Sequence, residues 1–276
     1  MFKKIFKYLF IKDAVTIDHA NYLYKIKSRK ITIRLLQIIM LISFFAIWEL
    51  LGYYEVINTF LMSQPSKIYN LIIKMINTGE LFQHIKVTLM ENLTGFSIGT
   101  FFGTLISIIL WWSDYLYKFL EPYLVILNSI PKVALGPVII VWLGNDYRSI
   151  IVMAILVSVI VTIIMLTGGF REVEEDKIKL LKTLGANKKQ ILLKLILPAS
   201  IPTIFSAVKV SIGLSLVGTI VGEYLVSRAG LGYLIVYGGQ VFNLHMVMAS
   251  IIILSIIAGI MYYLILLLEN YIIKWK

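Results

Sequence analysis

Six long apolar runs, separated by polar or charged stretches, dominate the pattern of this sequence. A helix that crosses a membrane needs about 20 mostly apolar residues, and each run has about this length. The pattern therefore predicts an all-α integral membrane protein with six transmembrane helices. The expected spans are Ile33–Leu51, Leu89–Trp112, Pro122–Leu143, Ile150–Gly168, Ile201–Val226 and Val247–Leu268.

The third expected span differs from the others because Pro131, Gly136 and Pro137 interrupt it. Proline lacks the N–H donor that the interior of a helix needs. A broken helix at membrane depth is tolerated only where protein or a water-filled cavity covers its free backbone groups. We therefore expect a broken span that is covered by protein or lines a cavity.

Two segments outside these spans have the apolar spacing of amphipathic helices. Pro65–Ile76 is expected to form a short helix on the outer side of the membrane. Residues 1–30 form a basic amphipathic cytoplasmic segment, in which Phe2–Phe10 has the apolar spacing of an interfacial helix, with a merely basic tail as the alternative. Lys12 and Asp13 end the apolar run too early for a signal peptide. Residues 31–276 then form one membrane domain.

Composition supports the membrane assignment and excludes several classes of protein. Hydrophobic residues make up 59% of the chain and charged residues 15%. Soluble domains are roughly 45–50% apolar and about 25% charged. An ordinary cytosolic enzyme, a disordered chain and a nucleic-acid-binding protein are therefore excluded. The chain has no cysteine, and its three histidines are too scattered to suggest a metal site.

The basic residues predict the orientation of the spans. The net charge is +11. Of the 26 lysines and arginines, 19 fall on one predicted side of the membrane, which comprises the N-terminal segment, the loop with Lys118, the loop after span four and the C-terminus. The opposite side holds only five. Basic residues concentrate in the cytoplasmic loops of membrane proteins. Both termini are therefore expected in the cytoplasm, which agrees with an even number of spans.

The loop between spans four and five, Phe170–Pro202, carries the most specific local signals. Acidic residues begin it and lysines follow, an order that complements a helix dipole. Gly185 has the position of a helix C-cap, and Asn187 with Gln190 forms a capping-box pattern. We expect two helices joined by a glycine turn, the second ending at Leu197-Pro198. The alternative is a charged hairpin that only enforces topology.

This hairpin resembles the coupling loop of ABC importer permeases of the sulfonate/nitrate/taurine-type branch. The resemblance is carried by Gly185 and, ending thirteen residues later, Leu195-Ile196-Leu197-Pro198. The family's Glu-Ala-Ala positions fall on Lys179, Leu180 and Leu181, so the family's acidic residue is absent there. Further segments match in order, namely Asn128–Pro137, Trp142-Leu143-Gly144, Leu197–Pro202, and Glu223 followed by Gly230-Leu231-Gly232.

The resemblance implies a type I ABC importer permease fold, with a coupling-helix loop at residues 170–198. It implies a permease subunit that forms the path for a small anionic or zwitterionic solute in the bacterial cytoplasmic membrane. The chain has no phosphate-binding loop, so it is not itself an enzyme. ATP and magnesium would be used by a separate ATPase subunit, and no cofactor by this chain. The other expected partners are a second permease subunit, most simply a copy, an extracytoplasmic solute-binding protein and membrane lipid.

The resemblance also assigns candidate residues to two sites. The residues expected to contact the ATPase lie in the hairpin and are Glu174, Glu175, Leu181, Gly185, Ala186, Leu195, Leu197 and Pro198. Glu174 or Glu175 could replace the acidic residue that the family has at the position of Lys179. The translocation path or gate falls to Asn128, Ser129, Pro131, Lys132, Pro137, Thr219 and Glu223.

Each charged or polar candidate also has a purely structural interpretation. Glu223 is either a gate residue or an interfacial glutamate, and Lys132 either faces an anionic solute or is packed within the broken span. Hydroxyl residues such as Thr219 also pack helices together, as do glycines spaced by four at Gly95, Gly99 and Gly103. Lys209 is expected to extend toward the cytoplasm.

Three other functions fit parts of the pattern. The scaffold subunit of an energy-coupling-factor vitamin transporter is also helical, but it lacks the broken span and the Leu-Pro exit seen here. An intramembrane enzyme would need catalytic residues at membrane depth, where this chain offers only His245 near a span. A channel would not need a capped docking hairpin.

Overall fold

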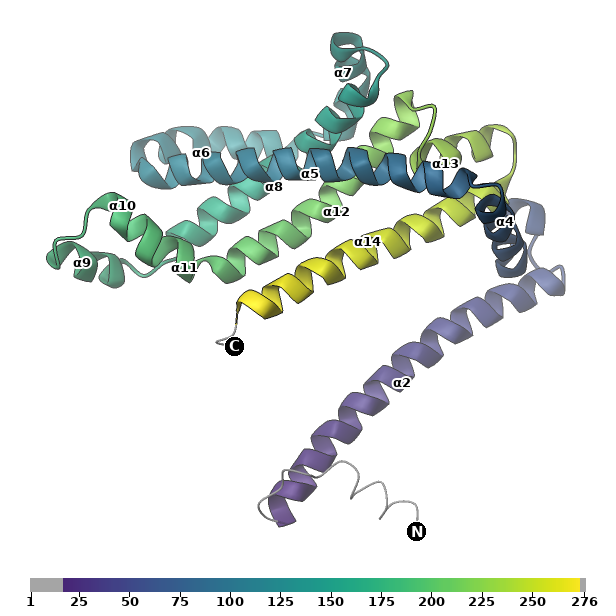
Figure 1. Ribbon diagram of the computed structural model, residues 1–276, viewed down its shortest axis with the longest axis horizontal. Coiled ribbons are helices and arrows are strands. Elements are labelled where there is room, and N and C mark those ends of the chain that lie inside the picture. The colour runs from purple at the N-terminus through teal and green to yellow at the C-terminus, as the bar shows by residue number, and fades with distance from the viewer. Residues whose placement is uncertain (1–16, 274–276) are drawn as a thin grey trace. The chain divides into compact units, whose positions relative to one another are not determined.

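The computed structural model describes residues 17–273 (Figure 1), and within this range the chain is helical and contains no strand. The expectation of an all-α fold is confirmed. Contacts divide the chain into two units, Met1–Lys67 and Ile68–Lys276. Each unit is described by itself below. The predicted interfacial helix at Phe2–Phe10 lies outside the described residues.

Among the described residues of the first unit, the long helix α2 (Ile17–Tyr53) is followed by the short α3 (Thr59–Met62). The helix includes the expected first span but begins well before Ile33, so the basic stretch and the apolar run form one continuous helix. At its far end, the Glu49 carboxylate accepts hydrogen bonds from the Gln64 side chain at 2.6 Å and from the Ser66 N–H at 3.0 Å. These bonds tie α2 to the beginning of α4 (Pro65–Asn77).

The second unit holds the remaining helices. They are α5 (Glu80–Trp112), α6 (Asp114–Ser129), the 3₁₀ turn η1 (Lys132–Leu135), α7 (Gly136–Leu143), α8 (Tyr147–Arg171), α9 (Glu175–Thr183), α10 (Lys188–Ile191), the π-turn η2 (Leu192–Ile196), α11 (Leu197–Ala199), α12 (Ile201–Val226), α13 (Leu231–Gln240) and α14 (Leu244–Ile272).

The described chain has five helices that are long and apolar enough to cross a membrane, or six if one bent pair counts as a span. The expected fifth span coincides with α12, and the first, second, fourth and sixth lie within longer helices. The bent pair is Asp114–Ser129 with Lys132–Leu143, at an angle of 83°. The third span is therefore broken, as expected, but its helix begins at Asp114 rather than at Pro122.

Helix α8 packs closely against both α5 and α12. On the α5 side, a Cβ added at Gly95 would lie 2.5 Å from the Cβ of Ala154. On the α12 side, a Cβ added at Gly218 would lie 2.7 Å from the Cα of the same alanine. Only glycine permits such approaches, which are typical of helices packed in membranes. The glycines spaced by four in α5 therefore pack helices within this chain.

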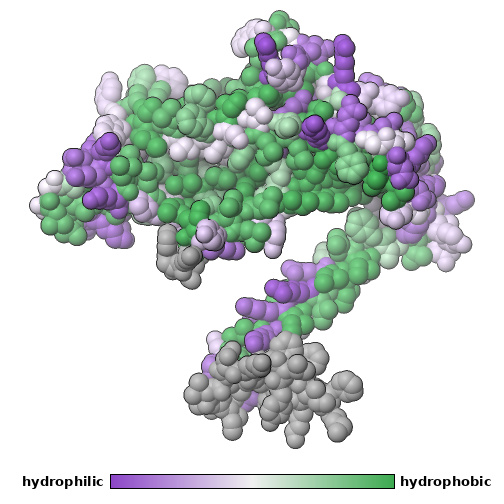
Figure 2. All heavy atoms as spheres, viewed as in Figure 1, coloured by the Kyte–Doolittle hydropathy of each residue, from purple (hydrophilic) through white to green (hydrophobic). Residues whose placement is uncertain are grey.

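Two buried apolar clusters hold the second unit together. One lies where α4, α12, α13 and α14 meet, with Met75, Leu216, Leu231 and Leu254 among its members. The predicted amphipathic helix at Pro65–Ile76 contributes to this cluster as α4. The other joins the end of α8 to the hairpin. Figure 2 shows a broad apolar band over the second unit between hydrophilic ends, as a protein that spans a bilayer requires.

Candidate functional site

The hairpin between α8 and α12 begins with α9, which ends as the sequence predicts. Gly185 has φ +82°, and the N–H groups of Gly185 and Ala186 donate to the carbonyls of Lys182 and Leu181 at 3.0 and 2.9 Å. This pair of bonds is the Schellman motif, in which glycine takes the left-handed conformation. The predicted C-cap at Gly185 is confirmed.

The second half of the hairpin begins at the predicted capping box. The Gln190 N–H donates to the Asn187 side chain at 2.8 Å, and the Asn187 N–H donates to the Gln190 side chain at 2.8 Å. The two groups thus satisfy each other's free backbone donors. The glycine turn and the capping box fix the angle at which the chain leaves α9.

The end of this second helix differs from the expectation. The helix continues through Pro198 to Ala199, because a π-turn at Leu192–Ile196 precedes the proline. There the Leu197 N–H donates to the Leu192 carbonyl, one residue further back than in an α-helix. Proline lacks an N–H and clashes with the carbonyl four residues earlier, and the wider turn accommodates it. The expected end at Leu197-Pro198 is therefore wrong.

Four of the candidate hairpin residues are packing residues. Leu181, Ala186, Leu195 and Leu197 are partly buried against the second apolar cluster, which is centred on Phe170 and contains Leu166, Ile191, Leu192, Ile196 and Ala207. They hold the hairpin against the ends of the spans. Such packing allows the hairpin to move only together with those spans.

The outer face of α9 and its C-cap carries two leucines that were not among the residues predicted to contact the ATPase. Leu180 is 60% exposed and Leu184 74% exposed, on a helix whose other exposed side chains are charged or polar. Glu174 and Glu175 are also exposed and are paired with Lys177 at 2.9 Å and with Lys179 at 3.6 Å. A helical wheel centred on Ile178 and Leu181 would have revealed the two outer leucines.

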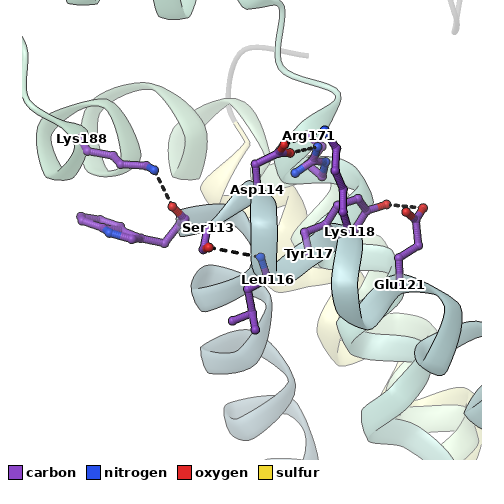
Figure 3. A network of polar contacts seen from close by, with 9 residues as sticks. Ser113, Asp114, Leu116, Tyr117, Lys118, Glu121, Arg171 and Lys188 are labelled. Carbon is purple, nitrogen blue, oxygen red and sulfur yellow. Dashed lines mark hydrogen bonds and ion pairs between the residues drawn. The ribbon is translucent and has the colours of Figure 1, made fainter.

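One polar network ties the hairpin to the beginning of α6 (Figure 3). Arg171, the last residue of α8, donates to Asp114 at 2.7 Å, and its guanidinium lies 3.9 Å from the centre of the Tyr117 ring. Lys118 is paired with the same aspartate at 2.9 Å. The side chain of Ser113 caps α6 by accepting from the Leu116 N–H at 3.2 Å.

A second contact ties the hairpin to the end of α5. The amine of Lys188, at the beginning of α10, donates to the Trp112 carbonyl and lies 5.7 Å from the centre of the Trp112 ring. The corner between α5 and α6 is therefore held by Arg171 on one side and by Lys188 on the other. Both cations were assigned no role from the sequence.

The bent span brings several path candidates together at its corner. The Lys132 amine donates to the Asn128 carbonyl at 3.1 Å and approaches the Asn128 side-chain oxygen at 3.4 Å. Ser129 donates to the Val125 carbonyl, and Pro131 begins the 3₁₀ turn. Lys132 has no carboxylate partner among residues 17–273, so its charge is held only by backbone and amide oxygens.

The side chains around this corner are exposed. Pro137 lies in the first turn of α7, and further along that helix Val141 and Trp142 are 82% and 77% exposed. Large apolar side chains on α6, such as Ile126, are also exposed. The free backbone groups of such a broken span must be covered by another protein surface or must face a water-filled cavity.

Glu223, near the end of α12, places its carboxylate at the first turn of α13. It is 1% exposed, and its carboxylate accepts from the Gly232 N–H. A Cβ added at Gly230, which has φ +117°, would lie 2.4 Å from this carboxylate. The Leu231 N–H donates to the Thr88 hydroxyl at 2.8 Å. In this conformation Glu223 is a buried cap rather than an interfacial side chain.

Other polar groups of the spans are buried and have partners within the protein, as the packing interpretation of Thr219 expects. Asn92 accepts from the Ser215 hydroxyl at 2.6 Å, whereas Thr219 is buried and donates to the Ser215 carbonyl at 3.0 Å. Lys209 forms an ion pair with Glu269 between α12 and α14, a partner that the sequence did not indicate. A single polar letter in an apolar run does not show which helix supplies its partner.

Comparisons with known proteins agree with this architecture. Residues 95–275 match the family described as the binding-protein-dependent transport system inner membrane component. The chain is 29% identical over 231 residues to the putative aliphatic sulfonates transport permease protein SsuC of Bacillus subtilis, covering 84% of each chain. It is 27% identical over 214 residues to the formylaminopyrimidine transport permease protein ThiX of Halalkalibacterium halodurans, covering 77% of this chain and 85% of ThiX.

A solved structure shares the fold. A chain of the MetNI methionine ABC transporter, in an inward-facing conformation, superimposes with a TM-score of 0.61 at 20% identity. The match covers 70% of this chain and 94% of that chain.

Proposed function

The chain belongs to the binding-protein-dependent transport system inner membrane components, and from this membership we propose that it is the permease subunit of an ATP-driven importer. Its hairpin docks a separate ATPase subunit, and its spans form part of the path of a small solute. Membership favours this function over the scaffold of an energy-coupling-factor transporter.

The observation that carries the docking proposal is the outer face of α9. Leu180 and Leu184 are exposed there, on a helix whose other exposed side chains are charged or polar and whose end is fixed by the Gly185 turn. Exposed apolar side chains surrounded by polar ones are typical of protein interfaces. Glu174, Glu175 and Gly185 support this surface, with the glutamates forming its charged border and the glycine fixing its angle.

The two ties to the α5–α6 corner suggest how movement passes from the ATPase to the membrane. Closure of the ATPase displaces α9, and the Arg171–Asp114 bond transmits the displacement to the beginning of α6. Helix α6 leads directly to the bend at Asn128, Ser129 and Lys132. The Lys188 contact with the Trp112 carbonyl keeps the end of α5 in place.

The exposed corner of the bent span supports a path that a second permease subunit completes. A copy of the chain would cover α6 and α7 through a closed two-fold arrangement and would supply a second docking hairpin. Lys132, which has no carboxylate partner among the described residues, would attract a small anionic or zwitterionic solute. Thr219 and Glu223 would act on this path only after α13 moves, because both are buried here.

The remaining partners follow from the family. An extracytoplasmic binding protein would deliver the solute, and the chain would lie in the bacterial cytoplasmic membrane with both termini inside. The named relatives transport sulfonates and a formylaminopyrimidine, so their names do not select one solute. ATP and magnesium would bind the ATPase, and this chain would need no cofactor.

Reconstitution tests the proposal. The chain is co-expressed with a candidate ATPase subunit and a candidate solute-binding protein from the same organism, purified and placed in liposomes loaded with ATP and magnesium. We expect a stable complex and ATP-dependent transport of a labelled sulfonate or pyrimidine solute. Transport without ATP, or a purified chain that never retains the ATPase, would contradict the proposal.

A further inference from the structure

A pocket of about 520 Å³ lies beside the hairpin, at the ends of the neighbouring spans. Its lining combines an apolar part with a charged part. The apolar residues are Trp111, Phe170, Val173, Ile178, Ala186 and Ile191, and the charged residues are Asp114, Arg171, Glu175, Lys179, Lys182 and Lys188. None of these side chains belongs to the exposed leucine face of α9.

One face of α9 supplies much of this lining. Glu175, Ile178, Lys179 and Lys182 are spaced by three, one and three residues, so they share a side of the helix. Leu180 lies on the opposite side. The two leucines of the proposed ATPase-docking face and the pocket therefore lie on different sides of α9, with Glu175 at the border between them.

Positive charge predominates in the pocket. Four basic side chains line it against two carboxylates; Asp114 is bound by Arg171 and by Lys118, and Lys179 is paired with Glu175 at 3.6 Å and with Asp176 at 3.3 Å. The Lys182 side chain forms no ion pair or hydrogen bond with any residue that the structure describes. The pocket thus has an unsatisfied attraction for an anion.

We propose that this pocket binds the headgroup of an anionic phospholipid. The part of the acyl chains nearest the headgroup would lie on the apolar lining. The location supports a lipid, because α5 ends at Trp112 and α8 ends at Arg171, where apolar spans give way to the charged hairpin. Basic pockets between membrane helices at this level bind anionic headgroups. Trp111 is the kind of side chain that lies at the headgroup level.

The bound lipid would stabilise the hairpin from its membrane side. Its phosphate would be shared between α9, through Lys179 and Lys182, and the ends of α8 and α10, through Arg171 and Lys188. This inference goes beyond transport itself, since the binding needs no ATPase or solute.

Lipid titration of the purified full-length chain tests the proposal. Phosphatidylglycerol and phosphatidylcholine are added to the detergent-solubilised protein, and the bound lipid is counted by native mass spectrometry. Lys179→Gln combined with Lys182→Gln should weaken phosphatidylglycerol binding about 25-fold, at about fivefold for each lysine near a charged lipid. Lys182→Arg, which keeps the charge, should bind like the parent.

The matched control changes the same charge outside the pocket. Lys189→Gln combined with Lys194→Gln lies on the same hairpin and should weaken binding less than about threefold. Equal losses in the two double variants would show diffuse attraction only and would overturn the site. Equal binding of phosphatidylcholine would also overturn it, as would full displacement by inorganic phosphate at millimolar concentration, because the pocket would then take free anions.

Discussion

Replacing Gly185 by valine tests the hairpin most directly, because the structure isolates one physical effect there. Gly185 has φ +82°, and a Cβ at this position would find no atom within 4 Å. Valine therefore meets no steric clash, and the whole cost arises from the left-handed backbone. That cost is roughly 1–2 kcal/mol for a residue with a Cβ.

The expected consequence is a changed hairpin within an intact membrane domain. A strain of about 1–2 kcal/mol reduces the population of the native turn relative to alternatives by a factor of about 5–30. If only the native turn docks, the apparent affinity for the ATPase falls by up to this factor. Insertion and helicity should not change, because the turn lies outside the packed spans.

The assay compares ATPase affinity and solute uptake in a graded series at this position. Asparagine tolerates the left-handed conformation better than other residues with a Cβ, so Gly185→Asn should stay close to the parent. Alanine should be intermediate and valine weakest. Lys189→Gln is the appropriate surface control, since Lys188 contacts the Trp112 carbonyl and is not inert.

A parent-like Gly185→Val would refute the reasoning. If that variant binds the ATPase and transports normally, the turn does not orient a docking helix. The hairpin would then serve topology alone, which was the alternative left open by its charge pattern. A variant that fails to insert would contradict the claim that the strain is local.

Three further predictions address docking, transmission and topology. Leu180→Ala should lower the affinity for the ATPase about tenfold, which corresponds to about 1.4 kcal/mol for a leucine that docking partly buries. The control Thr183→Ala, on the same helix, should change this affinity less than about twofold. A titration of each variant with the ATPase measures both effects. Asp114→Asn and Arg171→Gln should each lower the amount of solute transported per ATP hydrolysed. The double variant should transport as much per ATP as either single variant, because both changes remove the same contact. Strictly additive losses would show that the two residues act separately. A reporter placed after Lys276 should be protected from external protease in intact cells, and cleavage there would reverse the proposed orientation.

Local turn chemistry was the part of the structure that could be predicted most closely. The conformations at Gly185, Asn187 and Gln190 depend on hydrogen bonds to residues only a few positions away, so the local sequence is enough to predict them. The span at Ile201–Val226 was also predicted to the residue, because polar residues flank its apolar run. Length and hydropathy sufficed for these features.

Tertiary partners could not be predicted in this way. Glu223 was interpreted from its depth in a span, yet its carboxylate is fixed by the Gly232 N–H. Lys209 was assigned by the general tendency of lysine to reach water, yet Glu269 from a distant helix lies beside it. Periodicity shows where a helix has an apolar face but does not show which helix supplies a polar partner.

The contrast between tight and loose packing suggests which element moves in the proposed mechanism. Helices α5, α8 and α12 are joined through glycines that leave no room for sliding, and added Cβ atoms there would lie 2.5–2.8 Å from neighbouring atoms at Gly95, Gly99 and Gly218. By contrast, none of the residues of α6, all of which the structure describes, is buried.

Closely packed helices move as one body, whereas a helix with few buried contacts can shift at low cost. A displacement of the hairpin would therefore move α5, α8 and α12 together as one body, and Arg171 at the end of α8 would act on the loosely packed α6 through Asp114. The bend between Ser129 and Lys132 would convert this shift into a change of angle between α6 and α7. The corner that carries Asn128 and Lys132 is thus the place where we expect docking at one end of the protein to alter the solute path.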